Sequence, residues 1–144
     1  MGAEPAPATE GAWSATIAAA VLRRGAMIHT LSLLLAGVAV LVGGVAPHGT
    51  AFLAAAGAIV VLAAVEFWLA SRVALDADLF NALAARHTDL AGFDRAMRGL
   101  GLMPPAKAGR PIDARIRGAL RLLKLQAATL GLQVVVLVVF VLWI

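Results

Sequence analysis

The chain has 144 residues, of which 62% are hydrophobic and only 14% are charged. Soluble globular sequences average about 45–50% apolar and about 25% charged residues, so an ordinary water-soluble domain is excluded. The length fits one compact unit, and the absence of cysteine excludes disulfide frameworks, thiolate metal sites and cysteine nucleophiles. The net charge of +4 directs attention first to a membrane surface, because the chain is so apolar.

Three stretches of the sequence are long and apolar enough to cross a bilayer, whose hydrocarbon core of about 30 Å needs about 20 helical residues. They cover residues 25–46, 51–70 and 125–144, and the only charged side chain within them is Glu66. The first stretch exceeds the apolar region of about 7–15 residues in a secretory signal peptide, so we interpret it as a retained anchor. The predicted fold class is an all-α membrane protein with three transmembrane helices and an amphipathic helical cytoplasmic insert between the second and third.

The basic residues predict the orientation of these stretches. All twelve Lys and Arg residues lie within residues 1–24 and 71–124, and the loop 47–50 contains none. The positive-inside rule assigns the cationic segments to the cytoplasm. We therefore expect a multi-pass protein of a bacterial-type inner (plasma) membrane, with its N-terminus cytoplasmic and its C-terminus outside.

The remaining segments differ in composition. Residues 1–12 are rich in Ala, Pro, Gly and Glu, which predicts a disordered tail. Residues 13–70 are expected to hold a short interfacial helix followed by the transmembrane hairpin. Residues 71–124 form the basic helical insert, and residues 125–144 form the third transmembrane helix.

The insert carries ten cations and five anions, and its helices can be used in two ways. They can lie on the inner leaflet, where Lys and Arg attract anionic lipid and apolar stripes enter the interface. Alternatively, they can form a docking surface for a partner protein. No nucleic-acid-binding motif accompanies the charge, so no nucleic acid is expected. The candidate residues for docking lipid or a partner are Arg110, Arg115, Arg117, Arg121 and Lys124.

Each apolar stretch also carries a small or polar edge, of the kind that holds membrane helices together. In a hairpin that turns near residue 48, residues whose numbers sum to about 97 lie at the same level, because both helices rise equally per residue. His29 and Glu66 are therefore expected to share a plane, and the third stretch begins at that level with Gln126, Thr129 and, further on, Gln133. The predicted intramembrane polar cluster comprises His29, Ser32, Glu66, Gln126 and Thr129.

Glu66 is a functional-site hypothesis, because ionisable groups within spans are costly. Four residues separate it from Ala70 at the edge of the span, about 6 Å of helix, so it can also reach outward or pair with Arg72. Three roles stay open at this point. Glu66 can be a hydrogen-bond clamp between helices, a proton or substrate site, or a contact to a cation of another subunit.

Little else in the sequence carries chemistry. The three histidines fall in different compartments and cannot share a haem or a metal, and Asp76 and Asp78 face different directions on a helix. We therefore expect no enzyme activity and no cofactor. The leading hypothesis is a non-catalytic accessory or scaffold subunit of a larger membrane complex, whose partners are other membrane subunits or copies of itself. The alternative is a small oligomeric transporter or channel that uses Glu66 as a proton- or cation-coupling group.

Overall fold

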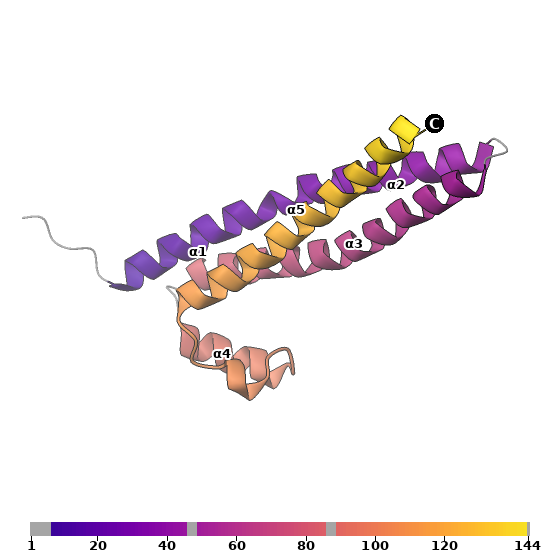
Figure 1. Cartoon of the computed structure of the whole chain (residues 1–144). Helices are drawn as coiled ribbons and strands as arrows, with labels where there is room; N and C mark the ends of the chain where they lie inside the picture. The colour runs from indigo at the N-terminus through magenta and orange to yellow at the C-terminus, as the bar shows by residue number, and fades with distance from the viewer. Residues whose placement is uncertain (1–6, 46–48, 86–88, 144) are drawn as a thin grey trace, which may run out of the picture. The chain divides into compact units, whose positions relative to one another are not determined.

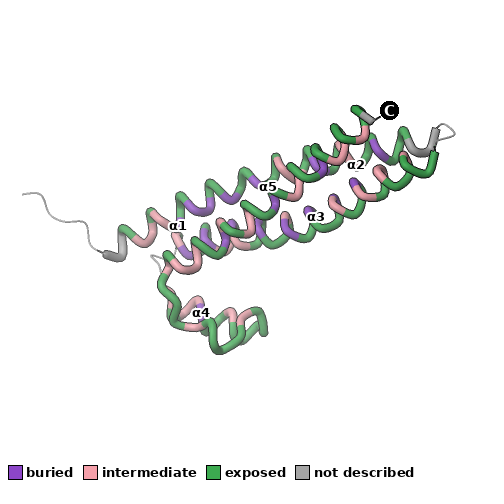
Figure 2. The backbone as a smooth tube through the Cα atoms, in the orientation of Figure 1, coloured by how far each residue is buried: buried purple, intermediate pink, exposed green. Residues whose placement is uncertain are grey.

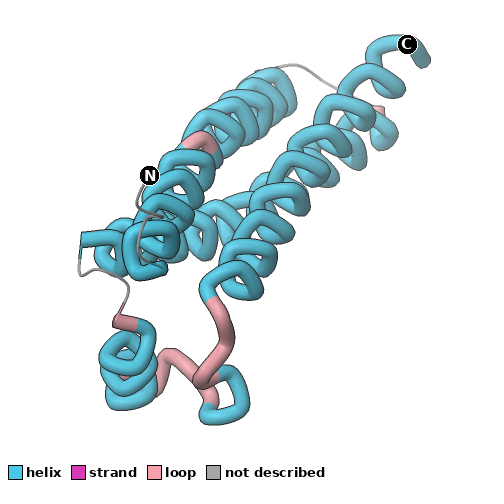
Figure 3. Tube along the Cα trace, turned by 90° about the vertical axis from the view of Figure 1, so that its left-hand side faces the viewer, coloured by secondary structure: helices cyan, strands magenta, loops and turns pink. Residues whose placement is uncertain are grey.

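The computed structural model describes residues 7–45, 49–85 and 89–143, and these residues are helical apart from short loops (Figure 1, Figure 3). No strand occurs in these three ranges, so the all-helical prediction is confirmed for them. The elements in chain order are α1 (Pro7–Arg23), α2 (Gly25–Val45), α3 (Thr50–Ala85), α4 (Leu90–Gly99), the 3₁₀ turn η1 (Pro105–Lys107) and α5 (Ile112–Trp143).

Within the described ranges, three helical stretches are long and apolar enough to cross a membrane by length and composition. They are Glu10–Val42, Thr50–Ala85 and Ile112–Leu142. Each extends beyond the corresponding predicted span at the end that carries the basic residues. The prediction of three helices of spanning length is confirmed.

Residues 1–6 of the predicted tail, residue 46 of the first predicted span and residues 47–48 of the predicted loop 47–50 lie outside the described residues. The rest of segment 1–12, for which composition predicted disorder, belongs to α1. This helix begins at Pro7. Proline suits the first helical position because its φ is close to the helical value and because the first backbone N–H groups of a helix have no intrahelical hydrogen-bond partner. Glu10 lies in the first turn, where a negative charge meets the positive end of the helix dipole.

The chain forms two compact units, so the expectation of one unit from its length is wrong. Unit 1 consists of Met1–Arg23 and Leu75–Arg121, and unit 2 consists of Arg24–Ala74 and Leu122–Ile144. Helices α3 and α5 each contribute to both units. Helix α1 therefore belongs with the insert, and it buries one face at helical spacing, formed by Ala15, Ala18, Ala19 and Leu22.

In unit 2, apolar side chains lie at the surface and polar side chains lie inside, which is the reverse of the distribution in a water-soluble protein. Helices α2, α3 and α5 of this unit each carry both exposed and buried positions (Figure 2). The exposed positions include many large apolar side chains, and the buried positions include polar side chains. Leu41 is 68% exposed and Phe67 is 58% exposed, whereas Glu66 is fully buried. A water-soluble domain has few contiguous apolar patches of this kind and seldom buries a carboxyl group.

Candidate functional site: a buried polar network

Glu66 of α3 is the centre of a polar network inside unit 2. Its Oε2 atom lies 2.8 Å from Nδ1 of His29 on α2. Its Oε1 atom accepts a 2.7 Å hydrogen bond from Nε2 of Gln126 on α5. One fully buried carboxyl group on α3 thus joins side chains from both other helices of the unit.

The partners of Gln126 fix the orientation of its amide. Nε2 donates both to the carboxyl group of Glu66 and, over 2.8 Å, to the backbone oxygen of Gly25 on α2. Both of these atoms accept hydrogen bonds, so the nitrogen rather than the oxygen of the amide must face them. Gly25 allows the approach, because a Cβ atom there would lie 2.8 Å from Oε1 of Gln126.

A second bond lies two helical turns further along α5. Nε2 of Gln133 donates to the backbone oxygen of Ile59 on α3 over 3.1 Å. Gln133 follows Gln126 by seven residues, and Ile59 precedes Glu66 by seven, so the two helices keep one register over this distance. In unit 2, α5 therefore runs antiparallel to α3 and parallel to α2.

The five predicted cluster residues do not all join this network. His29, Glu66 and Gln126 lie within hydrogen-bond distance, as described above. Ser32 is fully buried, but its hydroxyl has no hydrogen-bond partner among the described residues. Thr129 donates its hydroxyl to the carbonyl of Leu125 in its own helix over 3.0 Å.

His29 is the member of the network that reaches the surface of unit 2. Its side chain is 25% exposed, and its ring lies 5.7 Å from the ring of Phe67, centroid to centroid. The sequence offered Arg72 as an alternative partner of Glu66, but the Arg72 guanidinium lies over the ring of Trp68, 5.4 Å from its centroid.

Unit 1 contains a separate ion pair, between Asp94 on α4 and Arg115 on α5. Nη2 of Arg115 lies 2.8 Å from Oδ1 and 3.0 Å from Oδ2 of Asp94. The backbone N–H of Gly109 donates to Oδ2 over 2.7 Å. The guanidinium also lies over the ring of Phe93, 5.5 Å from its centroid. These contacts connect α4 to the loop that contains Gly109 and to the start of α5.

Two opposing influences act on the pKa of Asp94. Desolvation by burial raises this pKa, but the hydrogen bonds from Gly109 and Arg115 favour the ionised carboxylate. The positive charges of Arg115 and Arg98 act in the same direction. The net effect holds the pKa of Asp94 below its ordinary value, so the carboxylate stays ionised at neutral pH.

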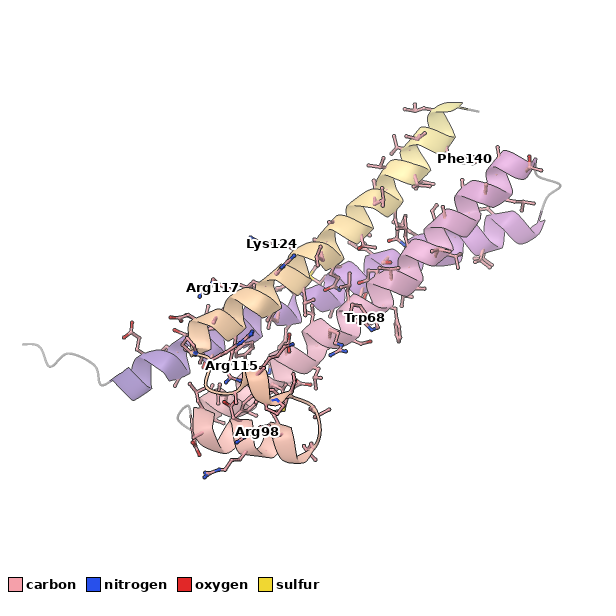
Figure 4. The ribbon with its side chains drawn as sticks, turned by 60° about the horizontal axis from the view of Figure 1, so that its bottom comes forward. Trp68, Arg98, Arg115, Arg117, Lys124 and Phe140 are labelled. Carbon is pink, nitrogen blue, oxygen red and sulfur yellow. The ribbon has the colours of Figure 1, made fainter. Side chains whose placement is uncertain are left out.

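No pattern in the sequence indicates Asp94. Because Asp94 pairs with Arg115, one of the five predicted docking residues is engaged inside unit 1. The side chain of Arg115 is only 14% exposed, and its charge is paired with the buried carboxylate of Asp94. The other four side chains are exposed, and Arg117 and Lys124 lie along the outer side of α5 (Figure 4). The exposed members are Arg110, Arg117, Arg121 and Lys124.

Among the residues that the structure describes, no group of three or more His, Asp or Glu side chains could hold a metal ion. Comparison of the chain with protein-family models, with curated proteins and with solved structures finds no match.

Proposed function

We propose that this protein is a non-catalytic accessory or scaffold subunit of a larger membrane assembly, anchored by three transmembrane helices. The observation that carries the proposal is the use of Glu66. Both of its carboxyl oxygens are engaged by side chains of the same chain, and the group is fully buried. A group that exchanges protons or binds a substrate needs an atom that the substrate can reach. Glu66 instead serves as a clamp between helices.

The outer surface of unit 2 supports the membrane anchor. Val38, Leu41, Val135 and Val139 are between 55% and 68% exposed, and they come from two different helices. Exposure of apolar surface to water costs about 25 cal/mol per Å², so a cover of lipid or of neighbouring helices is strongly favoured. The same surface offers partner subunits a large area for close packing.

The distribution of basic residues supports the orientation. The cations lie in the segments before α2 and between the predicted second and third spans. By the positive-inside rule we propose an inner membrane location, with the N-terminus and unit 1 on the cytoplasmic side. Anionic lipids of the cytoplasmic leaflet and other membrane subunits are the proposed partners.

The accessory role is tested by purification of the tagged chain in a mild detergent. We expect other membrane proteins to co-purify at a constant ratio through two successive chromatographic steps. The double variant Arg117→Glu/Arg121→Glu should lower their yield, because it reverses exposed charge on α5, whereas Asp78→Lys on α3 serves as a charge-changing control. Recovery of copies of this chain alone would contradict the accessory role.

One observation favours a second candidate, a small oligomeric transporter. The 25% exposed side chain of His29 lies 2.8 Å from buried Glu66, so the two side chains form a polar path from the interior to the surface of unit 2. Proteoliposomes separate the two candidates. A transporter shows a proton flux that Glu66→Gln abolishes, whereas a scaffold subunit shows no flux with either chain and loses stability in the variant.

A further inference from the structure

The turn that ends α4 presents two leucines in a fixed conformation. Gly101 N–H donates to the carbonyl of Arg98 over 3.0 Å, and Leu102 N–H donates to the carbonyl of Met97 over 2.9 Å. These two bonds, with Gly101 at a φ of 68°, form a Schellman motif, which glycine favours because it has no Cβ. Leu100 and Leu102 flank this glycine and are 72% and 57% exposed. The motif holds both leucines outward on a rigid turn.

The apolar side chains of α4, for which the sequence left insertion into lipid open, face α3 inside unit 1. Phe93 and Met97 line two pockets together with Leu79 and Leu83 of α3. Helix α4 therefore packs against the end of α3. The exposed leucines of the turn, rather than these side chains, remain available for another surface.

The exposed charges of residues 90–110 have one sign. Between residues 90 and 110 the only acid is Asp94, which is buried against Arg115. The exposed charged side chains of this segment are Arg95, Arg98, Lys107 and Arg110. Four cations around two exposed leucines match an anionic surface with an apolar layer beneath it.

Within unit 1, the turn that ends α4 lies beside α3. Leu102 and Met103 line one pocket together with Asp76, and Leu100 lines another with Ala82. The turn thus lies beside residues 76–83 of α3. Asp76 follows Ala70, the predicted end of the span, by six residues, about 9 Å of helix. The headgroup region of a bilayer is about 5–8 Å thick on each side, so Asp76 lies just outside it, within reach of long side chains.

We propose that the leucine turn (Leu100–Leu102), with Arg95, Arg98, Lys107 and Arg110 around it, docks on anionic lipid headgroups of the cytoplasmic leaflet. The two leucines enter the interface, and the four cations bind phosphate groups at its surface. This docking rests on the membrane embedding proposed above, and it fixes unit 1 against the leaflet from which α3 emerges.

The experiment uses the full chain in lipid nanodiscs. The sequence has no cysteine, so Leu102→Cys and Ala91→Cys each provide one labelling site for a fluorophore. Ala91 is exposed at the other end of α4 and serves as the matched control. Quenching by aqueous acrylamide and by a lipid-attached nitroxide is measured in phosphatidylcholine discs, and in discs that contain one third phosphatidylglycerol.

We expect lipid quenching of the Leu102→Cys label in the anionic discs, weaker lipid quenching in neutral discs, and aqueous quenching of the Ala91→Cys label in both. Each of the four cations replaced by Gln should lower the docking equilibrium about fivefold. Equal acrylamide quenching at both sites in anionic discs would overturn the docking. Shielding of the Leu102→Cys label from both quenchers would overturn it in favour of a protein contact, and equal docking in neutral discs would overturn the recognition of anionic lipid. Failure of the unlabelled chain to enter discs would instead contradict the membrane embedding itself.

Discussion

Oε1 of Glu66 and Nε2 of Gln126 are 2.7 Å apart, although sixty residues separate them in the chain. The same carboxyl group lies 2.8 Å from His29, so α2, α3 and α5 meet at one point. Transfer of a polar group from water to an apolar environment without a hydrogen-bond partner is unfavourable. The cost is about 4–8 kcal/mol in a solvent that cannot form hydrogen bonds. Any rotation of one helix that breaks these bonds incurs such a cost. The network therefore specifies which faces of the three helices pack together.

Replacement of Gln126 by Leu should destabilise unit 2 by about 1–2 kcal/mol, because it leaves Glu66 and the carbonyl of Gly25 without their donor. Thr129→Val on the same helix is the control, since the Thr129 hydroxyl bonds only within α5. Denaturant titration in detergent micelles measures both free energies of unfolding. A double-mutant cycle with Glu66→Leu should give a coupling of about 0.6 kcal/mol, with about 1.7 kcal/mol as the upper range. Equal losses for Gln126→Leu and Thr129→Val would contradict the clamp.

Gly25→Ala should destabilise the fold although alanine is the better helix former. The added Cβ would lie 2.8 Å from Oε1 of Gln126 and 3.1 Å from Cγ1 of Val73. The amide is held by two hydrogen bonds, so it cannot move away without losing one of them. At Gly37 of the same helix nothing lies within 4 Å, and Gly37→Ala should gain up to about 1 kcal/mol of helix propensity. Thermal unfolding of the two variants should therefore shift in opposite directions.

Ser32→Ala should leave stability unchanged or raise it by up to about 1 kcal/mol. The Ser32 hydroxyl is buried without a partner among the described residues, so its removal relieves a desolvation cost. Ser71→Ala, at an exposed site where the hydroxyl bonds the carbonyl of Phe67, is the control with little expected effect. A loss of more than about 1 kcal/mol in Ser32→Ala, measured by the same denaturant titration, would show that the hydroxyl has a partner.

Asp94→Asn should destabilise unit 1 by about 3 kcal/mol at neutral pH, because Arg115 keeps a buried charge without its counterion. The folded-state pKa of Asp94 is lower than the unfolded value, so the stabilisation is complete above about pH 4 and is lost as the pH falls through the folded-state pKa. The difference in unfolding free energy between the two chains should therefore shrink below about pH 4. Asp113→Asn, in the exposed first turn of α5, is the matched control outside the ion pair. A difference that persists unchanged into acid would contradict the ion pair.

The positions of His29 and Glu66 could be anticipated because a helical hairpin has a regular rise, and counting from its turn gives the level of each residue. The face of a helix is harder to predict. Gln126 and Gln133 differ by only about 20° around α5, whereas Thr129 lies about 60° from Gln126. Thr129 is therefore level with the cluster but directed elsewhere, and a threonine hydroxyl is readily satisfied by its own helix.

The Asp94–Arg115 pair could not be read from the sequence, because it depends on the path of the loop between α4 and α5. No periodic pattern connects two residues 21 positions apart on either side of a Gly- and Pro-rich loop. The N-cap of α4 is different, since Asp89 accepts a bond from the backbone N–H of Gly92 within one local turn. Local chemistry was thus predictable, and contacts that need the folded chain were not.

The account depends on three helices crossing a bilayer with the basic segments on one side. The absence of native cysteine allows a direct test with Thr50→Cys, at the start of α3, and Lys107→Cys, in the basic loop. A membrane-impermeant maleimide is applied to intact spheroplasts and to lysed ones. The account predicts that Thr50→Cys is labelled in both, and that Lys107→Cys is labelled only after lysis. Labelling of both positions in intact spheroplasts, or of Lys107→Cys alone, would contradict it.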